Sequence, residues 1–240
     1  MPEQPSREAL DGAFELLKNL KQGDDTELLG PIQLTVQALH NDPAGQKALE
    51  KRLIAHLGAG SSRATKDFVC RELALIGSEE SVPALAALLP DESISHMARY
   101  ALERIPGPAV DKALRDSLGT VKGTVKAGVI NSIAVRRDAK SIPQLTAALK
   151  DSPEVAAVAA KALGEIGTSE AAKALAAFRG SAPEALRPAA ADASLICAER
   201  LVASGQRNEA VAILEALNVA SQPAHVRLAA SRALSMATRL

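Results

Sequence analysis

The chain has 240 residues, of which 47% are hydrophobic and only 2% aromatic, and 28 Lys and Arg balance 28 Asp and Glu. This apolar content is ample for a buried core. The zero net charge and the lack of Trp argue against a protein that holds nucleic acid through bulk positive charge and stacked aromatic side chains.

Two features of the sequence bear on location and redox chemistry. The N-terminal residues MPEQPSREAL lack the basic segment and apolar core of a signal peptide, and no apolar run approaches the length of a membrane span. We therefore expect no membrane association and a cytoplasmic location, although a chain from which a leader had been removed would have the same sequence. Cys70 and Cys197 are too few for a disulfide framework or a thiolate metal site, and both are expected to be buried.

The first quarter of the chain, residues 1–60, predicts N-terminal capping helices and a degenerate first hairpin. Helices are expected over residues 6–20, 25–40 and 42–57. Asp42 and Pro43 suit the start of the third of these helices, as its N-cap and its first residue. The stretch GAGSS that follows lacks the pattern of a phosphate-binding loop and is interpreted as a linker.

The strongest pattern is a repeat of about 30 residues, in which each unit carries two apolar anchors. The first anchors recur every 29 to 31 residues and are Leu73, Leu102, Ile133 and Leu163. The second anchors follow twelve residues later and are Leu85, Leu114, Leu145 and Leu175. Each unit therefore predicts two short helices. Four such repeats are expected in the region 61–180, at about 62–91, 92–122, 123–152 and 153–181.

Positions on the first helix of each unit divide into a buried and an exposed face. Four residues before the anchor the chain has Val69, Ala98, Val129 and Ala159, which predict the buried face. Two residues before the anchor it has Arg71, Tyr100, Asn131 and Lys161, which predict the exposed face. Tyr100, the only tyrosine, lies near His96, Arg99 and Glu103. We interpret this group as a solvent-exposed helix face and not as an active site.

The turn after each first helix is predicted to contain a residue of positive φ, because glycine ends helices in this way. Gly77, Gly107 and Gly167 occupy these turns. In the third repeat the sequence VRRD stands there instead. Arg136 and Arg137 could bind a carboxylate or phosphate, while Asp138 could orient them or cap the next helix, and an exposed turn is the alternative.

The stretches CRELALIGSEESVPALAALL and AAKALGEIGTSEAAKALAAF resemble short HEAT-type repeats of the variety described in phycobilisome lyases. The resemblance covers roughly residues 62–179. It implies an all-α, right-handed α-α superhelix, that is, a HEAT-like solenoid. It also implies that the first helices lie outside and the second helices line a concave surface.

The region 182–240 predicts a longer hairpin that resembles a tetratricopeptide unit, with helices over residues 184–204 and 206–219. A final helix follows in PAHVRLAASRALSMATRL, which matches a first helix but has no second helix after it. Because a solenoid needs a polar cap, we interpret the chain as the N-terminal region of a longer protein, or as one whose end another subunit covers, including a second copy. A last helix that folds back is the alternative.

From the family resemblance we expect a non-enzymatic scaffold that binds another protein or another domain of its parent chain, with no nucleic acid and no membrane as partner. The expected contact residues are Lys112, Asp116, Gln144 and Lys173 on the second helices, together with the Arg136, Arg137 and Asp138 corner. No catalytic, cofactor or metal residue is assigned. None of the four histidines precedes Glu, so the His-Glu pairs of deoxyhypusine hydroxylases are missing. A bilin-lyase-like enzyme or chaperone is the alternative, and a nucleic-acid-binding HEAT-like protein a more remote one.

Overall fold

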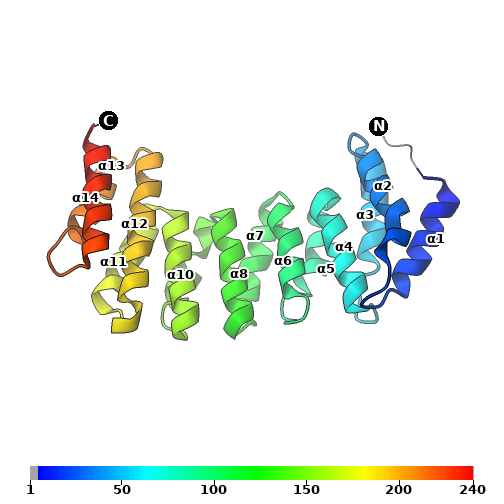
Figure 1. Ribbon diagram of the computed structural model, residues 1–240, viewed down its shortest axis with the longest axis horizontal. Coiled ribbons are helices and arrows are strands. Elements are labelled where there is room, and N and C mark those ends of the chain that lie inside the picture. The colour runs from blue at the N-terminus through cyan, green and yellow to red at the C-terminus, as the bar shows by residue number, and fades with distance from the viewer. Residues whose placement is uncertain (1–4, 240) are drawn as a thin grey trace. The chain divides into compact units, whose positions relative to one another are not determined.

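The computed structural model describes residues 5–239, and side chains up to Ala237. It divides the chain into two compact units, of which unit 1 ends at Val121 and unit 2 begins at Lys122. Every regular element among the described residues is a helix (Figure 1). The all-α prediction is therefore confirmed.

Unit 1 contains the N-terminal helices and the first two predicted repeats. Its elements are α1 (Arg7–Lys18), η1 (Thr26–Leu29), α2 (Gly30–Ala38), α3 (Pro43–Ile54), α4 (Arg63–Ile76), η2 (Glu79–Ser81), α5 (Val82–Ala86), α6 (Ser95–Arg104) and α7 (Pro108–Ser117). The helix α4 packs on α6, and α5 packs on α7, so first helices meet first helices and second helices meet second helices. This is the stacking of paired helices that the repeat predicts.

Unit 2 continues the same alternation. Its elements are α8 (Gly123–Arg136), η3 (Ala139–Ser141), α9 (Ile142–Ala148), α10 (Pro153–Ile166), α11 (Ser169–Ser181), η4 (Glu184–Leu186), α12 (Arg187–Ala203), α13 (Arg207–Leu217) and α14 (Ala224–Arg239). The first helices α8, α10 and α12 lie side by side in chain order (Figure 1). Each unit is thus a stack of helical hairpins, as in a HEAT-like solenoid.

The buried and exposed faces agree with the sequence pattern. All eight anchors, of both helices, are at most 1% exposed. The residues four positions before the first anchors are also buried, whereas Arg71, Tyr100, Asn131 and Lys161 are all exposed. Arg136, which stands three residues after its anchor where the other three repeats have isoleucine, is partly exposed. The hairpins therefore share one core pattern, because each buries the same positions against its neighbours.

Helix α1 is held against the rest of unit 1 by backbone carbonyls at its C-terminal end as well as by its apolar face. The Thr65 hydroxyl donates to the carbonyl of Leu17 at 2.8 Å, and the Ser62 hydroxyl donates to the carbonyl of Leu20 at 2.5 Å. On the other side the ring of Phe14 stacks on His56, with centroids 5.6 Å apart. Burial, and secondarily nearby Arg52, lowers the pKa of His56. The carbonyls at the end of α1 thus find partners at the start of α4.

The prediction of positive φ in the turns holds for two of the three glycines. Gly107 has φ 108° and Gly167 has φ 62°, in the left-handed region. Gly77 was predicted wrongly, since its φ is −64°. A larger residue is excluded at this position by steric contact, because a Cβ on Gly77 would lie 2.4 Å from the Leu73 carbonyl oxygen and 2.9 Å from Cδ1 of Ile105. Glycine at this turn permits close packing between hairpins.

The contact between α10 and α12 in unit 2 also depends on a missing side chain. A Cβ on Gly164 would lie 2.5 Å from the backbone oxygen of Ala193. Both residues are buried, and small residues surround them on both helices. The two backbones therefore approach each other at a distance that only glycine tolerates at position 164.

Replacing Gly164 by Ala should destabilise unit 2 by about 1–3 kcal/mol, because the added methyl group overpacks the α10–α12 contact. The matched control is Gly180→Ala in α11, where a Cβ would have no neighbour within 4 Å. That change should raise stability by about 0.5–1 kcal/mol through helix propensity. Urea unfolding followed by circular dichroism measures both, and equal effects of the two substitutions would contradict the packing explanation.

Candidate functional site

The second helices present the same exposed ridge in every repeat of both units. The two positions that flank each second anchor, two residues before it and two after it, are exposed in all four repeats. They are Pro83 on α5 and Ala87 directly after it, Lys112 and Asp116 on α7, Pro143 and Ala147 on α9, and Lys173 and Ala177 on α11. We call these eight residues the second-helix ridge. The predicted contact residues Lys112, Asp116 and Lys173 belong to it, and Gln144, also exposed, lies beside it.

The charged members of the ridge differ between the two units. In unit 1 the Lys112 ammonium lies 2.5 Å from the Asp116 carboxylate, one turn further along α7. Both side chains are well exposed, so the pair contributes little to stability. In unit 2 Gln144 and Lys173 come from different helices, and neither side chain forms a hydrogen bond or ion pair with another described residue. Unit 2 therefore offers polar groups that a partner can engage without first breaking a pair.

The corner Arg136–Asp138 has an unusual backbone. Arg137 ends α8 in the left-handed conformation, with φ 52° and ψ 42°, and its amide donates to the carbonyl of Ala134 at 3.1 Å. It is the one non-glycine residue of positive φ in the described chain. The third repeat thus keeps the turn that Gly167 makes in the fourth, but with an exposed arginine at the strained position.

Asp138 fills one of the two roles that the sequence left open, the capping of the next helix. It is the N-cap of η3, and its carboxylate accepts from the Lys140 amide at 3.2 Å and from the Ser141 hydroxyl at 2.5 Å. Capping of this kind satisfies helix amides that have no internal partner. The carboxylate therefore has a structural role at the start of the second helix.

Tyr100 and Arg104 contact each other on the surface of α6. The guanidinium of Arg104 lies over the Tyr100 ring, 3.6 Å from its centroid, and also donates to the Tyr100 carbonyl at 2.9 Å. Tyr100 itself is 38% exposed. This arrangement confirms the exposed-face interpretation of the tyrosine.

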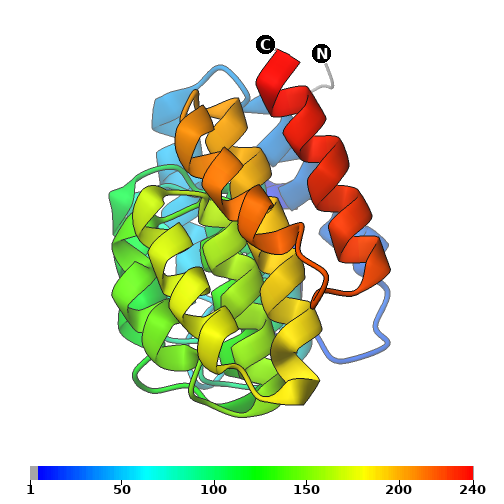
Figure 2. The ribbon, with the colours of Figure 1, turned by 90° about the vertical axis from the view of Figure 1, so that its left-hand side faces the viewer.

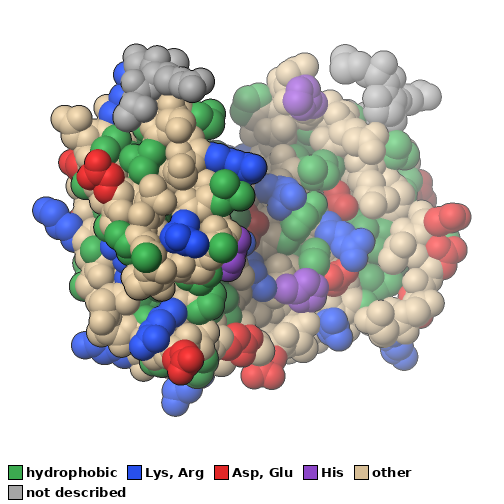
Figure 3. All heavy atoms as spheres, turned by 60° about the vertical axis from the view of Figure 1, so that its left-hand side comes forward, with side chains coloured by type: hydrophobic (Ala, Val, Ile, Leu, Met, Phe, Trp, Pro, Cys, Tyr) green, Lys and Arg blue, Asp and Glu red, His purple; other side chains and the backbone are tan. Residues whose placement is uncertain are grey.

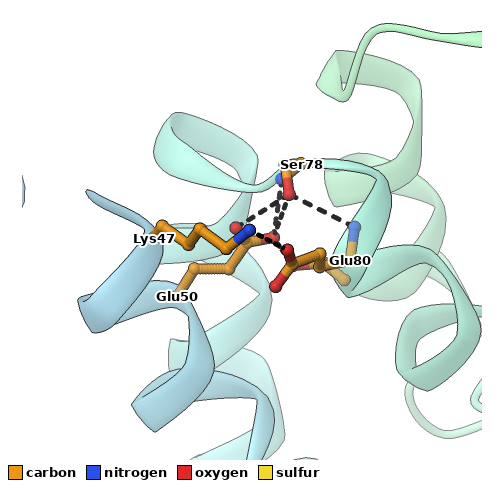
Figure 4. A network of polar contacts seen from close by, with 5 residues as sticks. Lys47, Glu50, Ser78 and Glu80 are labelled. Carbon is orange, nitrogen blue, oxygen red and sulfur yellow. Dashed lines mark hydrogen bonds and ion pairs between the residues drawn. The ribbon is translucent and has the colours of Figure 1, made fainter. Parts of the chain in front are cut away.

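Sequence reasoning missed a buried carboxylate that joins two hairpins of unit 1. Glu50 of α3 is only 2% exposed. It accepts from the amide and the hydroxyl of Ser78, at 2.7 and 2.8 Å, and from the Ser81 hydroxyl at 2.5 Å (Figure 4). Ser78 is also the N-cap of η2. A side chain from one hairpin thus supports the start of the second helix in the next, and Glu50 gave a signal only as an acid within an apolar helical pattern.

An exposed ion pair accompanies this buried group. The Lys47 ammonium lies 2.5 Å from the Glu80 carboxylate (Figure 4). Their hydrogen bond and mutual attraction raise the pKa of Lys47 and lower that of Glu80. Similar links join later hairpins, since Glu79 accepts from the Ala109 amide at 3.4 Å and the Ser169 hydroxyl contacts the Gln206 side chain at 2.9 Å. These contacts hold hairpins in register, and we assign them no ligand.

The reactive side chains of the described residues include two cysteines, Cys70 and Cys197, both buried. Burial raises the pKa of the Cys70 thiol to about 12 and that of Cys197 to about 11, so both thiols stay protonated at neutral pH. Within the described residues no group of three or more His, Cys, Asp or Glu side chains is placed to hold a metal ion. In the same part of the chain, no helix is both long and apolar enough to cross a membrane.

One polar cavity of about 470 Å³ lies in unit 1, between the loop after α1 and the start of α4. Basic side chains line it, among them Lys21 and Arg63, but so do Asp24 and Asp67. Arg71, also in the wall, is already paired with Asp67 at 2.8 Å. The mixed charges give the cavity little preference for an anion.

Arg137→Gly should stabilise unit 2 by about 1 kcal/mol, since glycine adopts the left-handed conformation without the steric cost that an L side chain meets. Arg137→Ala is the control, because it removes the guanidinium but keeps the Cβ and the strain. Thermal and urea unfolding should separate the two variants. Equal stabilities would mean that the charge of the arginine, and not its backbone, sets the cost.

Glu50→Gln should destabilise unit 1 by about 1–3 kcal/mol, because an amide offers one acceptor oxygen where three donors now converge on a buried carboxylate. Glu80→Gln makes the same change in the neighbouring exposed pair and should have a much smaller effect. Urea unfolding of both variants tests this contrast. A similar loss for both would show that burial of Glu50 is not what matters.

Comparison with known proteins gives one match in sequence and several weak ones in structure. Residues 122–196 match the sequence profile of HEAT repeats. No curated protein is similar enough in sequence to count as a relative. An engineered protein of known structure is 21% identical, covering 94% of this chain and 68% of its own, with a TM-score of 0.44.

Two natural proteins of known structure have comparable scores. The complex of CpcE and CpcF of phycocyanin lyase from Nostoc sp. PCC7120 is 17% identical, covers 99% of this chain and 97% of its own, and has a TM-score of 0.43. Human deoxyhypusine hydroxylase in complex with glycerol is 15% identical, covers 79% of this chain and 96% of its own, and has a TM-score of 0.39. These likenesses are too weak to bear on the function of this chain.

The sequence match and the fold agree within unit 2. The matched residues run from the start of α8 into α12. Over this range the helices alternate and stack as the repeat pattern predicts, with the anchors Ile133, Leu145, Leu163 and Leu175 in the core. Residues 122–196 thus carry HEAT repeats.

Proposed function

We propose that the chain is a non-enzymatic scaffold that binds another protein, or another domain of a longer parent chain, along the second-helix ridge. The observation that carries this proposal is the recurrence of exposed residues at the same two positions of every second helix. Within each unit, a surface built on one register repeats its contacts at each hairpin, which suits an extended partner.

The composition of the ridge supports the same proposal. Five of its eight members are Pro or Ala, whose short side chains let a partner helix or strand come close to the backbone. The charged members and the neighbouring Gln144 would then fix the direction and register of that partner.

The proposal that the chain is not an enzyme draws support from its reactive groups. The thiols of Cys70 and Cys197 are fully buried and protonated. The lone tyrosine is covered on one side by Arg104 and is not placed in a cavity by any of the contacts described above. None of these groups has the activated nucleophile or the nearby base that covalent or acid-base catalysis requires.

The test compares two matched charge reversals in unit 2. Lys173→Glu alters the ridge on α11, whereas Lys161→Glu makes the same change on the exposed face of the first helix α10. Partners are captured from an extract of the source organism on each immobilised protein and quantified by mass spectrometry. We expect a partner that the native protein and the Lys161 variant retain and the Lys173 variant loses.

The opposite patterns would count against the proposal. A partner that both variants retain equally binds elsewhere, and one that only the Lys161 variant loses binds the first-helix face. Circular dichroism of both variants serves as the folding control, since both lysines are exposed and neither change should disturb the core.

A further inference from the structure

A second surface of unit 2 is distinct from the second-helix ridge and lies at α14. The first helices α10 and α12 pack closely, but α14 rests mainly on α13 and meets α12 only along an edge. Figure 2 views this end of unit 2, with α14 in red beside α13 in orange. The regular packing of first helices therefore opens between α12 and α14.

The opening is an apolar groove of about 500 Å³. Its apolar lining includes Ala198 and Val202 of α12, Leu214 of α13, and Ala229, Ala233 and Met236 of α14. Most of these side chains are small, so a helix laid in the groove can approach both walls. Met236, which is 69% exposed, provides a flexible apolar edge that adapts to its partner.

A further exposed apolar side chain stands on α14 beyond the residues that line the groove. Leu228 is 54% exposed and stands eight residues before Met236. At about 1.5 Å per residue, the two side chains are roughly 12 Å apart along the helix axis. This is close to the separation of anchors at i and i+7 on an amphipathic helix, which is the usual occupant of such grooves. A compact small ligand would cover the cavity but not the exposed Leu228.

Charge distinguishes a foreign helix from a second copy of this chain. Arg232 lines the groove midway between Leu228 and Met236, and Glu199 lines it from α12. Neither forms an ion pair with another described residue. The sequence of α14, from Ala224 to Arg239, contains no acidic residue. In Figure 3 hydrophobic and basic side chains lie interspersed over the near surface of this end.

A second copy packed through α14 about a two-fold axis would bring its own Arg232 against this one, because position 232 is at the middle of the helix. Like charges at that contact oppose association. A partner that carries a carboxylate there would instead pair with Arg232. A cation on its other flank would pair with Glu199.

We propose that the groove between α12 and α14 binds an amphipathic helix of another protein. Its apolar face lies on the groove lining, an acidic flank faces Arg232, and a basic flank faces Glu199. Because the two walls differ in charge, these flanks also set the direction in which the helix lies.

The probe is a fluorescent synthetic helix with Leu at i, i+4 and i+7, Glu along one flank and Lys along the other, measured by fluorescence anisotropy. A second peptide carries Lys on both flanks. The native protein should bind the mixed-charge peptide saturably and the all-Lys peptide at least about tenfold more weakly. In Arg232→Glu this preference should reverse, because both walls are then acidic.

Arg227→Glu is the matched control, since it makes the same charge change at an exposed position of α14 that does not line the groove. It should alter the affinity for the mixed-charge peptide by less than about threefold. Circular dichroism checks that both variants fold.

Three outcomes would overturn the proposal. The first is no saturable binding of the mixed-charge peptide up to about 1 mM. The second is an equal effect of the Arg232 and Arg227 substitutions, which would indicate non-specific attraction. The third is self-association of the native protein in sedimentation experiments that Met236→Glu abolishes, which would assign the groove to a second copy.

Discussion

A hairpin of two short helices has an apolar face that it cannot bury by itself, and this constraint organises the rest of the structure. Each repeat places one anchor on its first helix and one on its second, and all eight anchors are essentially inaccessible to water. That burial requires a neighbouring hairpin on each side, since the hydrophobic effect rewards only area that is removed from solvent. The spacing of the anchors therefore fixes which helices pack together within each unit.

The same constraint makes the surface periodic. Once the anchors are buried, the positions two residues away on either side of the second anchors must face outward. The same two exposed positions recur at every hairpin, although the residues there differ, as Lys112 with Asp116 and Lys173 with Ala177 illustrate. The residues at these exposed positions can therefore vary and form a binding surface with little effect on the buried core.

The sequence predicted what depends on this local periodicity and failed where distant segments meet. The buried and exposed columns, the caps and most helix bounds follow from residues within one hairpin. Gly77 was misjudged because its role depends on Ile105, in the next repeat, and not on its own φ. Glu50 escaped notice because its partners Ser78 and Ser81 lie about thirty residues away. Such contacts require knowledge of how hairpins dock.

The α12–α14 groove belongs to the same class of feature. The repeat pattern of the sequence predicted α14 as a first helix, but it carried no information on the distance between α14 and α12. The distance between two neighbouring helices depends on the residues that each of them places in the contact. Gly164 and Ala193 bring the backbones of α10 and α12 together, and no comparable approach occurs between α12 and α14.

The two proposed surfaces differ in how they would generate affinity. The second-helix ridge offers short side chains and scattered charges, so each hairpin contributes little apolar area and binding must be shared among several repeats. The groove and the part of α14 beside it hold Met236, Leu228 and an Arg232 without an ion pair, over a little more than two turns of one helix. Exposed groups of this kind at the centre of a contact carry a large share of binding energy. A partner of the ridge should therefore be long and tolerant of single substitutions, whereas a partner of the groove should be short and sensitive to one.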